Sequence, residues 1–315
     1  MNPLADRTGP IERSRIAYET THSFYPWMDS MIPRKIFGWS RAIGTRTVTY
    51  PNHPGKHDGE ALVTPQRSTA YKESRTGREV TSPPDAVVVV FSDDLLAYLT
   101  EAYAGEATEL TFGTLYSFAD LDHRVGVVGG FGIGAPTTAM VMEELVVDGV
   151  EAFLPVGFAG SLDPGIDMGE YVVCEKAVRD EGTSHHYAEP ARFAHPSGSL
   201  LETTERVLAE RDVPVHLGPS WTTDAFYRET VGEVERYASE GVLTVEMEAA
   251  AAFTVADHRG VDAAAMFVVS DYLGLSEWEP KFHLADEDLQ RLGDAAKDVL
   301  ASYLERTDAE TSAPV

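Results

Sequence analysis

Two carboxyl groups flank a methionine in residues 243–253, which read Leu-Thr-Val-Glu-Met-Glu-Ala-Ala-Ala-Ala-Phe. Glu246, Met247 and Glu248 lie where an apolar strand meets an alanine-rich helix. An acid in the first helical turn complements the helix dipole, which is sufficient to explain Glu248. Glu246 comes earlier, where capping favours Ser, Thr, Asp or Asn. A carboxyl group accepts hydrogen bonds when ionised and gives a proton when neutral, so the junction is a candidate site, with Glu246 and Met247 as candidate substrate contacts and Glu248 as a candidate catalytic residue. Taken alone, capping explains the junction better, until other clusters are considered.

Polar and aromatic residues also cluster directly after three other predicted strands. Residues 179–187 and 221–228 are two such runs, and Asp271 ends the third strand. Each has a structural alternative, because polar residues after a strand are also common as turn or helix caps. The candidate substrate contacts from these stretches are Arg179, His186, Phe226 and Arg228, and Asp271 is a candidate catalytic acid.

Two glycine-rich segments follow strands at 129–136 and 157–164. Taken singly, each is better explained as a tight turn that needs positive φ. Neither is followed by Gly-Lys-Ser/Thr, and the first lacks the acid that a dinucleotide ribose requires, which excludes both nucleotide-binding motifs. Ligands in α/β proteins nevertheless bind beside such loops. The candidates here are Gly132, Gly157, Phe158 and Ala159.

Regular patterns begin at the apolar run 86–91, which is typical of a buried strand. Strands alternating with helices predict a single α/β domain with a twisted, mostly parallel central sheet flanked by helices. We expect strands at 86–91, 109–118, 124–128, 152–156, 171–177, 213–217 and 263–269, with helices at 95–103, 137–147, 200–211, 231–240, 249–256 and 287–305.

The domain organisation expected from these patterns has three parts. Residues 1–82 carry many aromatics but few periodic runs, which indicates an irregular N-terminal extension that packs on the main domain or on a neighbouring subunit. The α/β domain spans residues 83–306, and residues 307–315 form a frayed tail.

Composition restricts the function. With 25 Lys and Arg against 51 Asp and Glu, the net charge of −26 argues against nucleic-acid and anionic-membrane partners. The acids are spread along the chain, as on the surface of cytoplasmic proteins from high salt. Without a signal-like or membrane-spanning apolar run, the protein is expected to be soluble and cytoplasmic.

Metal binding is not expected. The single Cys174 excludes intrachain disulfides and multi-cysteine metal sites. His185 and His186 are adjacent, so on regular backbone they point in different directions, and no third residue has ligand spacing. We expect the histidines to form hydrogen bonds.

Taken together, the motifs resemble the purine nucleoside phosphorylase and uridine phosphorylase family, which includes the methylthioadenosine nucleosidases. The matching segments are Gly-Phe-Gly-Ile-Gly-Ala-Pro at 130–136, Gly-Phe-Ala-Gly at 157–160, Thr-Asp-Ala-Phe-Tyr at 223–227, Val-Glu-Met-Glu-Ala at 245–249 and Ser-Asp at 270–271. The resemblance extends over residues 87–304, and the run 179–187 is most similar to a uridine phosphorylase-like subgroup.

The resemblance implies roles for four residues. Glu248 would hold the ribose hydroxyls, Met247 would pack under the sugar, Phe226 would stack on the base and Asp271 would face the leaving base. Cleavage of an N-glycosidic bond builds positive charge on the ribose and negative charge on the base, which suits a carboxylate at one end and a proton donor at the other. No metal or organic cofactor is implied, and inorganic phosphate would be a cosubstrate. A homo-oligomer is expected, because the family completes its sites across subunit contacts.

The sequence also departs from the family pattern. Phe-Ser-Asp-Asp at 91–94 replaces Gly-Asp-Pro with a following Arg, and Pro155 and Phe158 replace the Arg and the hydroxyl residue before the second glycine segment. Either relocated arginines, with Arg67, Arg179 and Arg228 as candidates, bind phosphate, or water is the nucleophile. Asp271 favours a purine, whereas run 179–187 favours uracil, so both bases remain open. A nucleoside-binding protein without activity is a third possibility, which retention of an acid at the leaving group disfavours.

Overall fold

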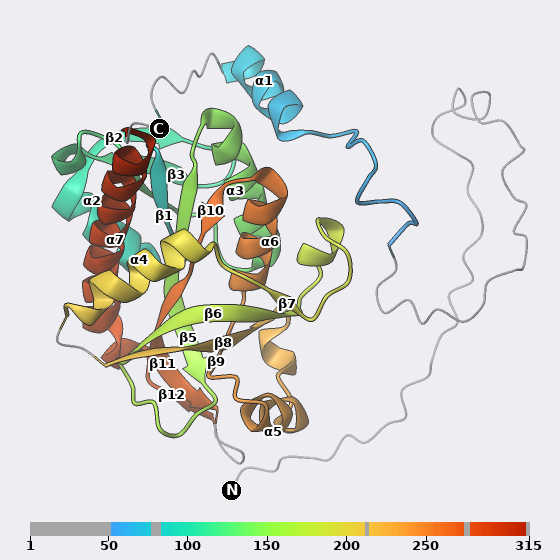
Figure 1. Cartoon of the computed structure of the whole chain (residues 1–315), viewed down its shortest axis with the longest axis vertical. Coiled ribbons are helices and arrows are strands. Elements are labelled where there is room, and N and C mark those ends of the chain that lie inside the picture. The colour runs from blue at the N-terminus through green and yellow to red at the C-terminus, as the bar shows by residue number, and fades with distance from the viewer. Residues whose placement is uncertain (1–51, 77–82, 212–213, 274–277, 313–315) are drawn as a thin grey trace, which may run out of the picture. The chain divides into compact units, whose positions relative to one another are not determined.

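A computed structural model describes residues 52–76, 83–211, 214–273 and 278–312 of the chain (Figure 1). All of them belong to one compact unit, Thr49–Val315. The helices are α1 (Pro65–Thr76), α2 (Asp93–Tyr103), α3 (Ala135–Asp148), α4 (Gly198–Ala209), α5 (Val231–Ser239), α6 (Ala249–Arg259) and α7 (Asp286–Ser312), with short 3-10 turns η2 (Ala119–Leu121), η3 (Ser184–His186), η4 (Phe226–Arg228) and η5 (Phe282–Leu284).

The strands form one sheet in which β5 is the central member. They are β1 (Ala86–Val90), β2 (Ala104–Glu109), β3 (Thr114–Phe118), β4 (Val125–Gly129), β5 (Ala152–Ser161), β6 (Tyr171–Asp180), β7 (Phe193–Ala194), β8 (Val215–Thr223), β9 (Thr244–Glu246), β10 (Asp262–Ala263), β11 (Met266–Leu273) and β12 (Trp278–Pro280). The first half of β5 pairs with β1 and β10, and the second half pairs with β9 and β11.

Five of these strands close on themselves. β5 pairs with β11, β11 with β6, β6 with β8, β8 with β9, and β9 returns to β5. The pairs β11–β6 and β9–β5 are antiparallel, so the sheet is mixed where the sequence predicts a mostly parallel one. Closure brings the ends of five strands that are distant in sequence onto one ring.

Helices cover both faces of the sheet, which confirms the predicted layered α/β fold (Figure 1). Apolar residues of α2, α4 and α7 pack on one face, and those of α3 and α6 pack on the other. Alternate residues of β1 point to opposite faces: Val88 and Val90 belong to the first cluster, and Val87 and Val89 to the second. This arrangement explains why the run 86–91 is apolar throughout.

Several predicted strand boundaries are wrong. β8 covers Val215–Thr223 where the sequence predicts a strand at 213–217, and two further differences involve glycines. The single strand predicted at 109–118 is a hairpin of β2 and β3, because Gly113 adopts a left-handed φ of 81° and turns the chain. The loop predicted at 157–164 is largely strand, since β5 continues to Ser161. Glycines are present in β5 for close packing: a Cβ on Gly160 would lie 2.4 Å from a methyl carbon of Leu273.

The predictions for both chain ends need correction where the structure describes them. Most of the expected irregular extension, residues 1–51 and 77–82, lies outside the described residues. Within it, however, Pro65–Thr76 forms helix α1. Proline suits the first helical turn, and the Thr64 hydroxyl accepts a hydrogen bond from the Arg67 N–H at 3.3 Å, as an N-cap does.

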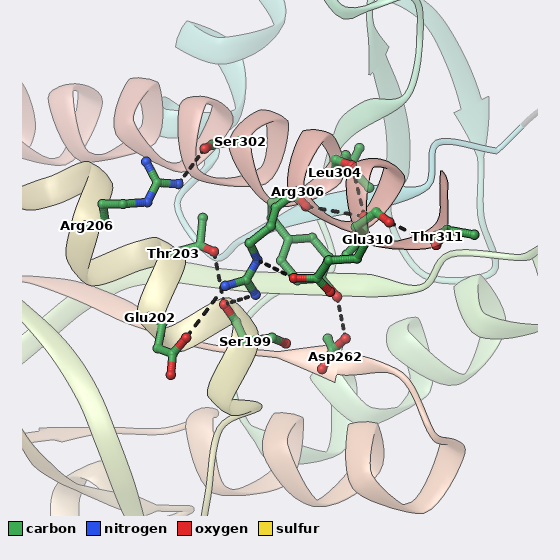
Figure 2. Close-up of polar contacts among 12 residues, drawn as sticks. Ser199, Glu202, Thr203, Arg206, Asp262, Ser302, Leu304, Arg306, Glu310 and Thr311 are labelled. Atoms are coloured by element: carbon green, nitrogen blue, oxygen red, sulfur yellow. Dashed lines mark hydrogen bonds and ion pairs between the residues drawn. The ribbon is translucent and has the colours of Figure 1, made fainter. Parts of the chain in front are cut away.

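The tail expected to fray at 307–315 is helical to Ser312, because α7 continues through it. Polar contacts hold this end in place (Figure 2). Arg306 donates to the Ser199 carbonyl at 2.7 Å, connecting α7 to α4, and its guanidinium lies 3.9 Å from Glu310 one turn later. Arg124 forms an ion pair with Asp308 at 2.7 Å. The described residues include no helix long and apolar enough to cross a membrane.

Candidate active site

Glu246 holds the start of helix α6. One carboxylate oxygen, Oε2, accepts the backbone N–H groups of Glu248 and Ala249, each at 2.7 Å. The other, Oε1, accepts the hydroxyl groups of Thr222 at 2.5 Å and Ser220 at 3.3 Å. All four donors belong to the protein, so Glu246 positions the junction, whereas the sequence analysis makes it a substrate contact. Glu246 thus caps the start of α6, a role for which Ser, Thr, Asp or Asn is usually preferred.

Glu248, in contrast, makes no capping hydrogen bond, although it occupies the N-cap position of α6. Its Oε1 accepts the N–H of Gly134 at 2.6 Å, and its Oε2 accepts the N–H of Met247 at 3.2 Å. Gly132 and Gly134 have φ values of 86° and 102°, which lets the glycine loop turn toward this carboxyl group. The dipole explanation of Glu248 is therefore incomplete, because its side chain is directed to the loop.

Burial governs the charge of Glu248. The pKa of this carboxyl group is raised to about 8, mainly by burial and then by the nearby charge of Glu246, whereas the N–H donors of Gly134 and Met247 oppose the rise. Met247 between them is half-buried. A buried carboxyl group that can change its charge near neutral pH is typical of functional sites.

Asp271, near the end of β11, is the second buried acid, with 3% of its surface exposed. Its Oδ1 accepts the Ser270 hydroxyl at 2.8 Å, and its Oδ2 accepts the indole N–H of Trp278 at 2.7 Å. Burial raises the pKa of Asp271 above its ordinary value, and these two hydrogen bonds oppose the shift. Asp271 is thereby suited to hold a proton, as the sequence analysis expects.

Four aromatic rings form a continuous row beside Asp271. Phe226 meets Trp278 edge to face at 5.9 Å between centroids, Trp278 meets Phe282 at 6.4 Å, and Phe282 meets Phe158 at 5.9 Å. Phe226 and Phe282 remain 38% and 37% exposed, so their rings are accessible to a ligand. Trp278 and Phe282 were missed by sequence reasoning, because neither lies in a recognised motif.

Register on β5 relates the two acids. Gly160 of β5 is paired with Val245 on one side and with Asp271 on the other. A Cβ on Gly160 would lie 3.1 Å from Asp271 Oδ2, so only glycine leaves room there. With about 4.8 Å between neighbouring strands, the β9 end and Asp271 are separated by about 10 Å. Gly157, Phe158 and Ala159 therefore lie on the strand between the two acids, where the sequence analysis placed a loop.

Apolar side chains occupy the end of β1, where the family pattern expects an arginine. The Phe91 ring meets Phe131 of the glycine loop at 5.9 Å between centroids. A Cβ on Gly157 would lie 3.2 Å from the same Phe91 ring. In the described part of the chain, no Arg or Lys donates a hydrogen bond to residues 130–134. At these positions the structure has apolar contacts where the family pattern has a cation.

The three remaining candidates lie on β6 and on the turns η3 and η4. Arg179 is buried and donates to the Ser184 hydroxyl and to the carbonyls of Glu189 and Ala188, at 2.8, 2.8 and 3.3 Å. It therefore shapes the loop that carries His186, whose side chain is exposed in η3. Arg228 is exposed in η4, next to Phe226.

A cavity of about 720 Å³ lies beside the same loop. Arg179, Phe193, Phe253 and Asp257 are among its lining residues, and Glu248, Asp271 and Phe226 are not. We place the site at the two acids, because among the described residues buried carboxyl groups, a glycine loop and accessible aromatic rings occur together there.

The stability of the protein should depend on pH through Glu248. Its pKa is raised from 4.5 to about 8, so the folded chain binds a proton that the unfolded chain releases. The free energy of unfolding should fall as pH rises from about 4.5 to about 8, by at most about 1.4 kcal/mol per pH unit from this group. Urea denaturation of the protein and of Glu248→Gln at several pH values measures the free energy of unfolding. If this free energy changes equally with pH in the two proteins, the prediction is wrong.

Comparisons with known proteins show which proteins the chain resembles. A guanosine phosphorylase from Halorubrum lacusprofundi is 36% identical over 132 residues, which are 42% of this chain and 55% of the relative. A uridine phosphorylase from Escherichia coli (strain K12) is 32% identical over 162 residues, covering 46% and 63%. The chain thus spans less than two thirds of the length of either relative.

Solved structures give a longer match. Two crystal structures of uridine phosphorylase from Vibrio fischeri ES114, one with bound 6-hydroxy-1-naphthoic acid, superpose with TM-scores of 0.59 and 0.61. They are 25% and 26% identical, and each comparison covers 71% of this chain and 93% of the solved chain. The model of the family described as "Phosphorylase superfamily" matches residues 85–305. Because this match covers more than half of the 315 residues, the chain belongs to the phosphorylase superfamily.

Proposed function

We propose that the protein is a nucleoside phosphorylase, which cleaves the N-glycosidic bond with phosphate to give a free base and ribose 1-phosphate. The observation that carries this proposal is the placement of Glu248 and Asp271 on either side of β5, both buried and both with raised pKa. The names of the relatives, which are uridine, guanosine and purine nucleoside phosphorylases, support the same reaction class.

The ribose end of the proposed site is Glu248 with Met247. As the glycosidic bond breaks, positive charge develops on the sugar, and an ionised Glu248 that accepts its hydroxyl groups binds this state more tightly than the substrate. The hydroxyl groups of the bound ribose and the positive charge that develops on the sugar both favour the ionised form of Glu248. Because Glu246 fixes the backbone of this junction through four hydrogen bonds, little rearrangement is needed during the reaction.

The base end is Asp271 with the row of aromatic rings. The departing base gains negative charge, which a protonated Asp271 can neutralise by giving its proton to a ring nitrogen. Trp278 orients this acid through its indole N–H, and Phe226 offers an accessible ring face for stacking. Protonation at one end and charge stabilisation at the other are the two requirements of glycosidic cleavage.

Phosphate would bind at the glycine loop that leads into α3. Backbone N–H groups at a helix N-terminus attract anions, and α3 follows this loop directly. The second candidate function is a nucleosidase, in which water attacks the ribose. The apolar contact of Phe91 with Phe131, and Pro155 in β5, favour this alternative, since both stand where the family pattern has phosphate-binding residues.

The two functions are separated by the sugar product. We expect purified protein in high salt to release ribose 1-phosphate from uridine, inosine, guanosine or adenosine, or 5-methylthioribose 1-phosphate from methylthioadenosine, and only when phosphate is present. Chromatography of base and sugar measures both products. Free ribose at a rate independent of phosphate would replace the phosphorylase by the nucleosidase, and no cleavage of any nucleoside would contradict both.

We also propose that the protein works as a cytoplasmic homo-oligomer. The exposed apolar side chains of Phe112, Ile133 and Met140 around the glycine loop support a subunit contact there. The acidic composition supports an environment of high salt.

A further inference from the structure

Basic residues are concentrated at the start of this acidic chain. Residues 1–80 contain 12 Lys and Arg against 8 Asp and Glu, a net charge of +4, whereas residues 81–315 contain 13 against 43, a net charge of −30. Helix α1 is the regular element that the structure describes within the basic region. Because opposite charges attract, the basic region is suited to contact acidic surfaces of this protein, in the same copy or in another.

Helix α1 uses one side to contact the rest of its own chain. Thr69 is 8% exposed, and Lys72 donates to the Glu144 carboxylate on α3 at 3.2 Å. Thr69 and Lys72 are three residues apart, so they lie on one face of the helix. The carboxylate of Glu144 also accepts the backbone N–H of Thr111, at 3.1 and 3.0 Å from its two oxygens. Glu144 thus brings together α1, α3 and the turn of the β2–β3 hairpin.

The opposite side of α1 is exposed and basic. Arg67, Tyr71 and Arg75 recur every four residues, which places them on one face, and Tyr71 is 69% exposed. Neither arginine forms an ion pair with another described residue, although acids outnumber bases about twofold in the chain. Just before the helix, Leu62 and Val63 are 84% and 80% exposed. This face is typical of a docking surface, because protein interfaces are enriched in tyrosine and arginine.

An acidic edge adjoins the same contact. β2 is an edge strand of the sheet and leads to the hairpin turn that carries Thr111. Its Glu106 and Glu109 are exposed, and in the described part of the chain no cation pairs with either of them. Phe112 in the turn and Met140 on α3 add apolar side chains that are 39% and 41% exposed. A basic surface, an acidic surface and an apolar surface therefore all adjoin the elements that Glu144 connects.

We infer that α1 binds the acidic β2 edge of a second copy of this chain. In a two-fold interface the same patches meet twice, so a molecule with one basic and one acidic patch is complementary to its own copy. The lengths agree as well. Arg67 and Arg75 are about 12 Å apart along a helix. Glu106 and Glu109 are about 10 Å apart along a strand.

The charge of the domain selects this occupant. A domain with a net charge of −30 repels a nucleic acid but offers carboxylates to a basic helix of another copy. The inference is independent of the proposed reaction. It extends the subunit contact proposed at the glycine loop to α1, a segment that lies outside the residues matched by the family model.

Charge reversal in the full chain tests this pairing. The α1 variant carries Arg67→Glu and Arg75→Glu, and the β2 variant carries Glu106→Arg and Glu109→Arg. Each variant alone opposes like charges, whereas one copy of each restores attraction at both contacts. We expect sedimentation equilibrium to give a dissociation constant raised at least about tenfold for each variant, and within about threefold of the unchanged chain for their equimolar mixture. The salt is the lowest that leaves the circular dichroism spectrum of the unchanged chain intact, because salt screens charges.

The matched control carries Arg236→Glu and Arg291→Glu, which change the net charge as the α1 variant does. These arginines lie on α5 and α7 with side chains 63% and 58% exposed. The control should associate like the unchanged chain, and equal weakening in the control would overturn the inference.

Three further results would overturn it: a monomeric unchanged chain, association that neither variant weakens, or a mixture no tighter than either variant alone. If the α1 variant loses only retention on heparin, α1 binds a polyanion and the inference also fails. Nucleoside cleavage is measured separately, so an intact pairing without cleavage overturns the proposed reaction alone.

Discussion

Replacement of Glu248 by Gln should lower kcat/KM for nucleoside cleavage by about a hundredfold to a thousandfold, as removal of one preorganised electrostatic partner does. The amide cannot carry the negative charge that stabilises a ribosyl cation. The amide is neutral, like the protonated carboxyl group that the free protein favours at pH 7 because the pKa of Glu248 is about 8. Steady-state kinetics with the best nucleoside measures the loss.

The fold should survive this substitution. A glutamine oxygen can still accept the Gly134 N–H, and removal of a group that is costly to ionise relieves some strain at higher pH. Glu202→Gln is the matched control, because Glu202 lies on α4 with a mostly exposed side chain. Normal turnover in Glu248→Gln would show that Glu248 does not hold the ribose. A loss of turnover in the Glu202→Gln control would show that the effect is not specific to the site.

Replacement of Glu246 by Ala should have the largest effect on stability, reducing the free energy of unfolding by about 3–5 kcal/mol. The change leaves the N–H groups of Glu248 and Ala249 and the hydroxyl of Thr222 without their acceptor in a buried place. Buried donors without partners each cost about 1–3 kcal/mol. Urea denaturation in high salt at pH 7 measures the effect.

Glu246→Gln is the informative companion variant. Its amide oxygen can keep the two backbone donors, while the hydroxyl of Thr222 can rotate to accept from the amide nitrogen, so we expect a loss of only about 1 kcal/mol. Glu248→Gln should be the most stable of the three variants, Glu246→Gln should be less stable, and Glu246→Ala should be the least stable. If Glu248→Gln proves less stable than Glu246→Ala, the division into one positioning acid and one substrate-facing acid is wrong.

Much of the fold followed from local pattern. The buried run of β1, the helices α2 and α5, and the alanine-rich α6 were predicted with small errors in their ends, because each is encoded by neighbouring residues. The errors in strand boundaries occurred where glycine has two possible structural roles. Glycine ends a strand at Gly113, but in β5 it lets Leu273 and Asp271 approach, and only the neighbours distinguish the two cases.

The site was recovered unevenly. Glu248, Met247, Phe226 and Asp271 were found through motifs, and the structure brings Phe226 and Asp271 together through Trp278. Trp278 and Phe282 were missed, because neither lies in a recognised motif. Arg179 is a cation in the sequence, but in the fold its donors are used by the loop that it holds.

The sequence by itself determined the acidic surface, the alternation of strands and helices, and the residue types available for chemistry, because composition and periodicity are properties of the chain. Only the tertiary structure decided which of two neighbouring glutamates is free to act. Glu246 finds its hydroxyl partners 24 and 26 positions away, and Glu248 finds the N–H of Gly134 114 positions away. No local pattern encodes contacts over such separations, since they exist only once β5, β11, β6, β8 and β9 have closed into a ring.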